Sequence, residues 1–483
     1  DIDDNDNDGY AAKVTVEQAL IKNDSLWNIN AVFDTDYINE NFRNIEGLYN
    51  PEFNRDWNLA PSTSDNQIIN GLGNQALLTG GLKAFHQKKG LASYRFEHLN
   101  YSEGFNGNRH IASARVFINR FTLATQTSFL SANSFENNST FFRTYNTIRY
   151  DQEKSWIGTK LAAENNQQEN KITKLLTDIS QKYKSYEVFT GIGDSTGVFT
   201  EIGYKYRVND SIRDNSLKKV NTSNTYYLDS RLIKNERTNL ALYVNYRTLK
   251  NEDSTKTKEQ SLNSRLQYNQ QFLSNLIQWN TVFETNSGTL PQQDFTYVEV
   301  EPGQGAYTWI DYNGNSIQEI EEFEIAQFQD QGSYIRVLLP NQIFIKTHQN
   351  RLSQTLTLNP SSWINSDSKT AKFLSHFYNQ SSYLIDRKIK RDGQSFNLNP
   401  FKNNSETALG LQSNFRNVLF FNRGKQQYTT SYTFLTNNSR NQLTVGFIAN
   451  SLTSHQLQFN HKFATSWLVN FQTSLDTNTS ESE

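Results

Sequence analysis

The stretch L-N-S-R-L-Q-Y-N-Q-Q-F-L-S-N-L-I-Q-W-N-T-V-F-E, residues 262–284, decides the fold class. Apolar and aromatic side chains fall mostly on positions of one parity there, and mostly Asn, Gln, Arg and Glu fall on the other. The first parity includes Leu262, Leu266, Tyr268 and Phe272, followed after the turn by Ile277, Trp279, Thr281 and Phe283. A period of two places successive side chains on opposite faces of a β-strand. The stretch therefore predicts two two-faced strands joined by a tight turn at Leu273–Asn275.

The same alternation recurs at residues 240–247, 457–463 and 467–475. It is expected both of a soluble β-sandwich and of a transmembrane β-barrel, because each has one apolar and one polar sheet face. Alternation alone therefore does not choose between these two architectures.

The lengths of the connections are more informative. Short connections are expected near Lys88–Gly90, Asn119–Arg120, Glu153–Ser155, Gly193–Gly197, Lys234–Arg237, Leu273–Asn275, Asn350–Arg351, Asn379–Gln380 and Asn422–Lys425. Long polar connections are expected at 102–109, 132–142, 165–182, 208–223, 249–260, 285–341, 360–369 and 386–405. Alternating lengths in an up-and-down meander put tight turns at one end and long loops at the other, as in outer-membrane barrels. Strands of about 9–13 residues suit a tilted membrane crossing, and roughly 20 of them would enclose a lumen.

The composition agrees with a two-faced sheet and excludes several classes of function. Hydrophobic residues make up 36% and aromatic residues 13%, so the chain is polar overall but not depleted of aromatics as disordered chains are. The net charge of −2 gives no electrostatic footprint for nucleic acid. Without cysteine, the chain has no disulfide, thiolate metal site or cysteine nucleophile. It also has no Met, and both ends read as parts of something longer.

One motif points to a metal. D-Y-N-G-N-S-I-Q-E-I-E-E, residues 311–322, closely follows the twelve-residue calcium loop. The predicted Ca²⁺ ligands are Asp311, Asn313, Asn315, the Ile317 carbonyl, Glu319 and the closing carboxylate of Glu322. Calcium prefers six to eight hard oxygen ligands, and this loop concentrates them. Ser316 stands where the loop requires glycine for its turn, and the alternative is an acidic surface turn followed by a helix.

Other candidate motifs carry less weight. Asp4, Asp6 and Asp8 have calcium-loop spacing, but Thr15 stands where the bidentate carboxylate is needed, so a solvated acidic linker is the alternative. G-I-G-D-S-T-G at 191–197 is flanked by strand-like sequence and reads as a hairpin turn, not as a phosphate loop. The seven histidines form neither H-E-x-x-H nor a recognisable triad, so no catalytic residue and no enzymatic activity is predicted.

Residues 297–326, Y-V-E-V-E-P-G-Q-G-A-Y-T-W-I-D-Y-N-G-N-S-I-Q-E-I-E-E-F-E-I-A, with D-Q-G-S-Y-I-R-V at 330–337, resemble a segment of large outer-membrane proteins of Bacteroidota. In that group the stretch usually reads N-G-N-G, so Ser316 is again a departure. The resemblance implies an outer-membrane location and a large barrel, but it supplies no activity. Such bacteria assemble giant barrels for protein secretion and nutrient import, so a part in such a machine is expected.

The sequence thus predicts an all-β chain forming a large antiparallel up-and-down transmembrane β-barrel of the bacterial outer membrane. Residues 1–75 are expected to form an acidic start and an irregular lead-in, and residues 76–483 the barrel, with a long inserted loop at 285–341 as plug, lid or docking element. The predicted function is structural or in transport or translocation, with membrane lipids and lipoproteins or other envelope subunits as partners. The alternatives are a soluble β-rich surface protein that binds glycan or protein, and an enzyme embedded in a barrel.

Overall fold

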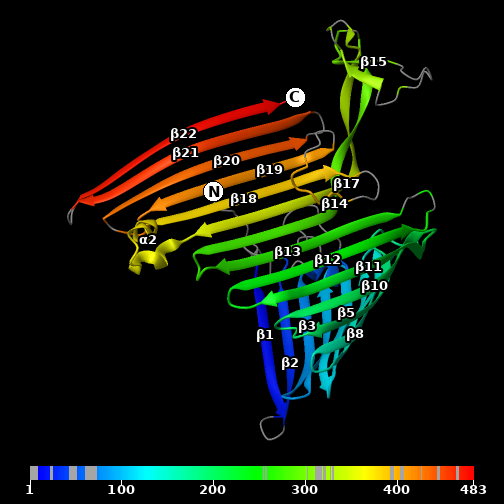
Figure 1. Cartoon of the computed structure of the whole chain (residues 1–483). Helices are drawn as coiled ribbons and strands as arrows, with labels where there is room; N and C mark the ends of the chain where they lie inside the picture. The colour runs from blue at the N-terminus through cyan, green and yellow to red at the C-terminus, as the bar shows by residue number, and fades with distance from the viewer. Residues whose placement is uncertain are drawn as a thin grey trace. The chain divides into compact units, whose positions relative to one another are not determined.

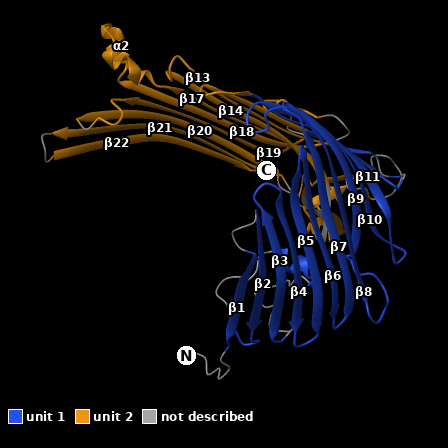
Figure 2. Ribbon diagram, turned by 90° about the horizontal axis from the view of Figure 1, so that it is seen from below, with its two compact units in different colours: residues 1–232, 245–260 blue, residues 233–244, 261–483 orange. Residues whose placement is uncertain are grey.

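The computed structural model describes residues 9–21, 26–42, 52–59, 73–253, 255, 258–301, 303–310, 318, 322–326, 328, 331–391, 396–402, 407–425, 427–442, 446–463 and 467–482. These residues form almost only β-strands (Figure 1). The chain divides into two compact units (Figure 2), unit 1 with residues 1–232 and 245–260, and unit 2 with residues 233–244 and 261–483.

The strands lying wholly or mostly in unit 1 are β1 (Ala11–Ile21), β2 (Trp27–Ile38), β3 (Gln75–His86), β4 (Gly90–Tyr101), β5 (Phe105–Ile118), β6 (Phe121–Ser134), β7 (Asn137–Asp151), β8 (Ser155–Asn170), β9 (Gln181–Gly193), β10 (Phe199–Arg213) and β11 (Ser216–Lys234). From β1 to β11, each strand pairs antiparallel with the next along the chain. A short helix, α1 (Glu52–Asp56), lies in the connection between β2 and β3. Strand β12 (Thr238–Asn251) contributes residues to both units.

Unit 2 holds, wholly or mostly, β13 (Glu259–Phe272), β14 (Ile277–Glu299), β15 (Tyr307–Trp309), β16 (Phe323–Ile325), β17 (Tyr334–Leu358), β18 (Phe377–Lys390), β19 (Ala408–Phe421), β20 (Tyr428–Gln442), β21 (Phe447–Phe463) and β22 (Trp467–Ser482). The long strands again pair in chain order, with β14 joined directly to β17 around the β15–β16 hairpin. Between β17 and β18 lie the 3₁₀ helix η4 (Pro360–Asn365) and helix α2 (Lys369–Leu374). No helix in the described ranges is long and apolar enough to cross a membrane.

The predicted fold class is confirmed. The described residues form 22 strands, and if the three-residue strands β15 and β16 are set aside, 22 − 2 leaves 20 long ones. The pairings between the described long strands, such as β10–β11 and β18–β19, are antiparallel, and successive strands follow one another up and down. The period-two alternation read from the sequence is thus the true period of the structure.

Several predicted turns are wrong. Asn350 and Asn379, each assigned to a tight turn, lie inside β17 and β18. Asparagine favours turns, but here the amides are satisfied within the sheet: Asn379 Nδ2 donates to Asn417 Oδ1 at 3.2 Å, and Asn350 Nδ2 donates to the Asn397 carbonyl. Cross-strand and loop partners therefore override the local preference for a turn.

The expected alternation of short and long connections holds only in part. The connections at 102–104, 135–136 and 214–215 are tight, because the polar residues beside them extend the strands. Asn209 Nδ2, for example, donates to Asn221 Oδ1 at 2.6 Å near the end of the β10–β11 ladder. Long connections are found at 39–74, 171–180, 300–333 and 391–407, and at 359–376, which contains the predicted long connection 360–369.

The sheet also begins earlier than the boundary placed at residue 75. Strands β1 and β2 already belong to it, and β2 pairs with β3 from Trp27↔His86 to Ile38↔Gln75. Within the lead-in predicted to be irregular, residues 52–59 are described and begin with α1. The predicted loop 285–341 is largely strand, because β14 and β17 stay paired as far as Glu299↔Tyr334.

Each unit has one apolar and one polar sheet face. The apolar face of unit 1 carries Ile157, Val188, Ile202 and Tyr226, which lie on four successive strands and are each 53–55% exposed. The opposite, polar face of unit 1 carries charged side chains of both signs, and these are described below. In unit 2, Phe283, Leu352 and Ile385 lie side by side on the apolar face of β14, β17 and β18.

Candidate functional site

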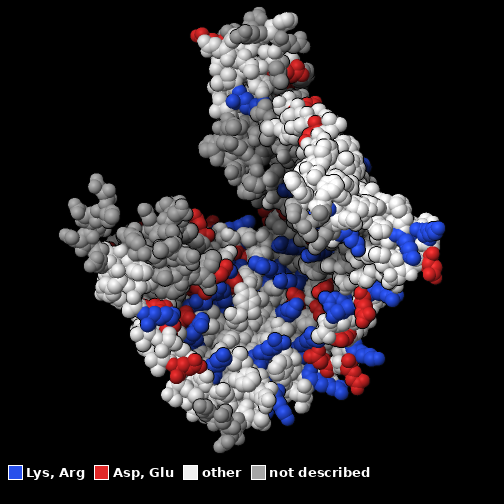
Figure 3. Space-filling model, turned by 90° about the vertical axis from the view of Figure 1, so that its left-hand side faces the viewer, with Lys and Arg blue, Asp and Glu red and all other residues white. Residues whose placement is uncertain are grey.

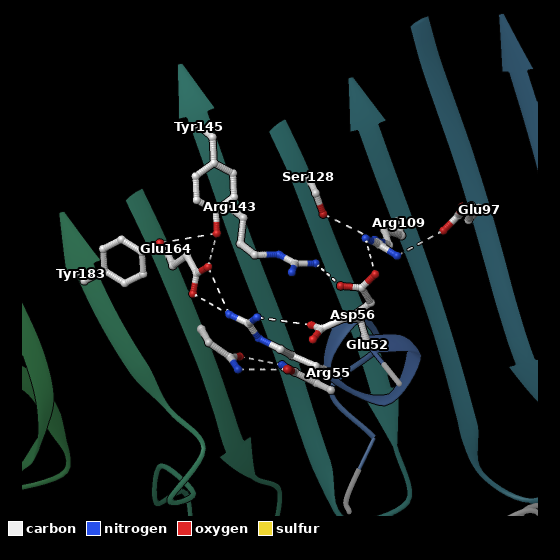
Figure 4. A network of polar contacts seen from close by, with 12 residues as sticks. Glu52, Arg55, Asp56, Glu97, Arg109, Ser128, Arg143, Tyr145, Glu164 and Tyr183 are labelled. Carbon is white, nitrogen blue, oxygen red and sulfur yellow. Dashed lines mark hydrogen bonds and ion pairs between the residues drawn. The ribbon is translucent and has the colours of Figure 1, made fainter. Parts of the chain in front are cut away.

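A short segment of the β2–β3 connection, residues 52–59, lies against the polar face of unit 1 (Figure 4). Its helix α1 places Phe53 and Trp57 one turn apart, with the Trp57 N–H donating to the Phe53 carbonyl at 3.1 Å. Asn58 has a φ of 51°, a left-handed conformation that asparagine tolerates and that ends helices. The helix therefore stops after one turn, and Trp57 is aimed at the sheet.

Trp57 anchors this segment in the main apolar cluster of unit 1. The residue is 1% exposed. The cluster comprises Trp57, Leu99, Tyr101, Phe105, Leu130, Ala132 and Phe141, with Phe53, Leu59 and Leu77 packed at its edge. The buried sheet residues of the cluster come from β4 to β7, so the segment lies across four strands. Burial of a tryptophan among so many apolar groups is a large stabilising contribution.

Gly107 of β5 makes room for the Trp57 ring. A Cβ at this position would lie 3.1 Å from Trp57 Cε3 and Cζ3, closer than ordinary van der Waals contact. Any side chain here would push the indole away from the sheet. The absence of a side chain at Gly107 is therefore matched to the docked position of Trp57.

Ion pairs hold the next part of the segment. Asp56 Oδ2 lies 2.8 Å from Arg109 Nη2 on β5, and Asp56 Oδ1 accepts a hydrogen bond from Arg143 Nη2 on β7. Arg109 Nη1 also lies 3.5 Å from Glu97 Oε2 on β4. The side chains of Arg109 and Arg143 are only 11% and 12% exposed, so both depend on nearby carboxylates for neutralisation.

Arg55 makes the corresponding contact with β8. Its Nη2 donates to both carboxylate oxygens of Glu164 at 3.2 Å, and its Nη1 lies 3.3 Å from Glu52 Oε2. Glu164 is 2% exposed and also accepts a hydrogen bond from the Tyr145 hydroxyl. Burial opposes the charge of Arg55, but the carboxylates of Glu164 and Glu52 outweigh it, so the pKa of the guanidinium lies above its ordinary value.

An amide pair completes the attachment. Asn58 Nδ2 donates to Asn166 Oδ1 at 2.6 Å, and Asn166 Nδ2 donates to Asn58 Oδ1 at 2.9 Å. Gln168 Nε2 donates to the Asn58 carbonyl at 3.3 Å. Apolar, ionic and amide contacts thus join Arg55, Asp56, Trp57 and Asn58 to strands β4 to β8.

This arrangement is chemically suited to holding a segment in place. Each of its carboxylates has a cationic or hydroxyl partner, so none is poised as a general base or nucleophile. Figure 3 shows basic and acidic side chains interspersed on one side of the molecule rather than separated by sign. Sequence reasoning missed segment 52–59. The available signal was Arg55-Asp56-Trp57, two opposite charges beside a large aromatic, in a stretch without strand alternation.

Most predicted calcium ligands, namely Asp311, Asn313, Asn315, Ile317 and Glu319, lie outside the described residues. Glu322 is described and is 3% exposed, and its Oε2 accepts a hydrogen bond from Trp309 Nε1 at 2.9 Å. Within the part of the chain that is described, no group of three or more His, Cys, Asp or Glu side chains could hold a metal ion. The calcium site stays a prediction.

The insert between β14 and β17 is capped by an aromatic cluster. Tyr297 stacks on Phe323 with ring centroids 4.2 Å apart, and Tyr334 meets Phe323 edge-on at 5.0 Å. Arg336 lies over the ring of Tyr307 at 5.0 Å. The extended β14–β17 ladder, with this cluster at its end, gives the insert an ordered structure. The insert is therefore better described as a two-stranded stalk (Figure 1) than as a loop.

Comparison with known proteins gives structural similarity only. No family model and no curated protein matches the chain. It is similar to the siderophore receptor PirA from Pseudomonas aeruginosa, with a TM-score of 0.37 and 8% identity over 98% of this chain and 77% of that one. The alcaligin outer membrane receptor FauA from Bordetella pertussis gives 0.36 and 9% over 98% and 73%. OpdL from Pseudomonas aeruginosa gives 0.23 and 8% over 97% of both chains. Similarity at this level identifies no family.

Proposed function

We propose that this chain forms the wall of a transmembrane β-barrel in a bacterial outer membrane and acts in transport or translocation across it. In this proposal the apolar faces contact lipid and the polar faces line a water-filled interior. Residues 52–59 then fold inward as a constriction. The resemblance of residues 297–326 to outer-membrane proteins of Bacteroidota supports the same location.

The contrast between the two sheet faces is the observation that supports this proposal. Ile157, Val188, Ile202 and Tyr226 form a continuous exposed apolar surface across β8 to β11. A soluble monomer rarely exposes such a surface, whereas lipid covers it in a membrane barrel. On the opposite face of the same strands, Lys160 Nζ lies 2.7 Å from Glu187 Oε1, an ion pair suited to water. This contrast disfavours the alternative of a soluble surface protein.

Membrane fractionation tests the proposal. We expect the expressed chain to sediment with membranes, to need detergent for extraction, and to migrate faster in gel electrophoresis when it is not boiled. Stable closed barrels resist unfolding in detergent and therefore remain compact. A chain that stays monodisperse in buffer without detergent would overturn the membrane assignment and favour the soluble alternative.

The stalk is proposed as a docking element for lipoproteins or other envelope subunits, because its aromatic cluster offers an ordered surface at the end of the β14–β17 ladder.

Calcium binding by residues 311–322 would stiffen the stalk. Titration calorimetry should show Ca²⁺ binding to the wild type and not to Asp311→Ala; identical heats would remove the metal prediction. Asp311 is a cleaner target than Glu322, whose replacement would also break the hydrogen bond to Trp309.

A further inference from the structure

On the apolar face of unit 2, one buried arginine, Arg387, lies in an unexpected setting. Arg387 of β18 lies on the same face as Ile385 and Ile389, and its cross-strand neighbours there are Asn350 and Leu411. Arg387 is 2% exposed, and Ile385 and Ile389 are 6% and 7% exposed. A positive charge is thus buried among mostly apolar groups.

Part of this guanidinium is unused. Arg387 Nη1 donates to the Asn399 carbonyl at 3.0 Å, but Nε and Nη2 are buried and have no hydrogen-bond partner in the described part of the chain. Buried polar groups in proteins are almost always hydrogen-bonded, so two unused donors on one guanidinium indicate a missing partner.

The described residues place no counter-ion beside Arg387. Among the described residues, no carboxylate oxygen lies within 4.0 Å of the Arg387 guanidinium. The adjacent Asp386 points to the opposite face, where it accepts a hydrogen bond from Gln349 Nε2 at 2.6 Å. An unpaired buried charge is destabilising, and an external anion at Nε and Nη2 would remove that cost.

The free edge of Arg387 defines the chemistry of that anion. Nε–H and Nη2–H point along one side of the planar guanidinium, the geometry that binds two oxygens of a phosphate or carboxylate at once. Arg391 brings a second cation nearby. Its guanidinium lies over the Phe396 ring at 5.1 Å, and its Nη1 lies 3.5 Å from Ser287 Oγ. Ser287 Oγ in turn lies 3.3 Å from His348 Nδ1. A second cation nearby strengthens the attraction for an anion.

The surroundings indicate where the phosphate comes from. Residues 396–402 lie over this part of the apolar face, and the Phe401 ring stacks on Tyr383 of β18 with centroids 6.2 Å apart. Leu398 and Phe401 are nevertheless 47% and 59% exposed. Exposed apolar side chains beside buried cations are the combination expected where a protein meets both the acyl chains and the headgroups of a membrane.

We propose that Arg387 binds the phosphate of an anionic lipid headgroup on the apolar face of unit 2. This inference rests on the proposed membrane location. It adds a specific lipid site to a surface that otherwise needs only general contact with acyl chains.

Melting temperatures in neutral detergent test the site. The variants are Arg387→Met, which removes the charge at similar volume, and Arg387→Lys, which keeps the charge but loses the two-donor edge. Arg416→Met serves as the control, because Arg416 is an exposed arginine on the opposite face of the neighbouring strand β19. Each protein is measured alone, with phosphatidylglycerol in mixed micelles, and with inorganic phosphate at the same phosphate concentration.

We expect phosphatidylglycerol to raise the melting temperature of the wild type and of Arg416→Met, and inorganic phosphate to leave both unchanged. Arg387→Met should lose the shift and should melt no lower than the wild type when lipid is absent, since it no longer buries an unpaired charge. Arg387→Lys should show a reduced shift.

Three results would overturn the lipid site. If phosphatidylglycerol raised the melting temperature of Arg387→Met as much as that of the wild type, lipid binding would lie elsewhere. If inorganic phosphate raised the melting temperature of the wild type as much as the lipid does, free phosphate would be the ligand. If lipid-free Arg387→Met melted below the lipid-free wild type, Arg387 would be a structural residue. Membrane fractionation of the same proteins tests the proposed function separately. If the chain fractionates with membranes but phosphatidylglycerol gives no shift, only the lipid site is rejected and the membrane location stands.

Discussion

Replacing Trp57 with alanine is expected to detach residues 52–59 from the polar face of unit 1. Trp57 is 1% exposed and lies at the centre of the apolar cluster, and truncation of a buried tryptophan costs about 3–5 kcal/mol. The ion pairs and amide contacts of this short segment do not offset such a loss, because its one-turn helix has no stability of its own. The strands remain paired, so we expect local release rather than global unfolding.

Two measurements detect the release of the segment, namely limited proteolysis and conductance. Limited proteolysis should cut Trp57→Ala within residues 52–59 at least ten times faster than wild type, the minimum expected for a loss above about 1.4 kcal/mol. In planar bilayers, Trp57→Ala should conduct more than the wild type if the segment narrows the interior. Trp467→Ala is the matched control, because Trp467 is 74% exposed. Unchanged proteolysis of Trp57→Ala would show that Trp57 does not hold the segment.

Replacing Asp56 with alanine is expected to have the next largest effect. The change leaves Arg143 without the carboxylate that it contacts on the segment, and it leaves Arg109 with only the longer contact to Glu97. Breaking a buried pair by removing one partner costs about 3–5 kcal/mol. We expect about 3 kcal/mol, because Asp56 keeps 19% exposure and water screens part of the charge.

A double-mutant cycle measured by urea unfolding separates this charge effect from lost packing. Arg143→Met should destabilise the wild type but should cost less, or even stabilise, in the Asp56→Ala background, because it removes the uncompensated cation. The control is Asp214→Ala, which breaks the exposed pair with Lys218 and should leave the unfolding midpoint unchanged. Additive effects of Asp56→Ala and Arg143→Met would contradict the ion pair as a source of attachment.

The strands were readable from the sequence wherever alternation was strong. Residues 262–284 fold as predicted into β13 and β14 around a turn at 273–276, because each side chain there finds the face that suits it. Polar strand ends were not readable, since Asn and Ser occur both in turns and in ladders. Asn209 and Asn221, taken for loop residues, pair across β10 and β11. Local propensity alone does not decide such positions.

By itself, the sequence determined the all-β class, the up-and-down order of about 20 long strands and the two-faced character of the sheet, because a period of two is a local property of the backbone. Only the tertiary structure decided which charges meet. The registers that place Glu97 opposite Arg109 and Arg143 opposite Glu164 join residues of separate strands. The contact of Arg55 with Glu164 spans 109 positions. Such meetings depend on the register of every intervening strand, since a shift of one residue moves a side chain to the opposite face.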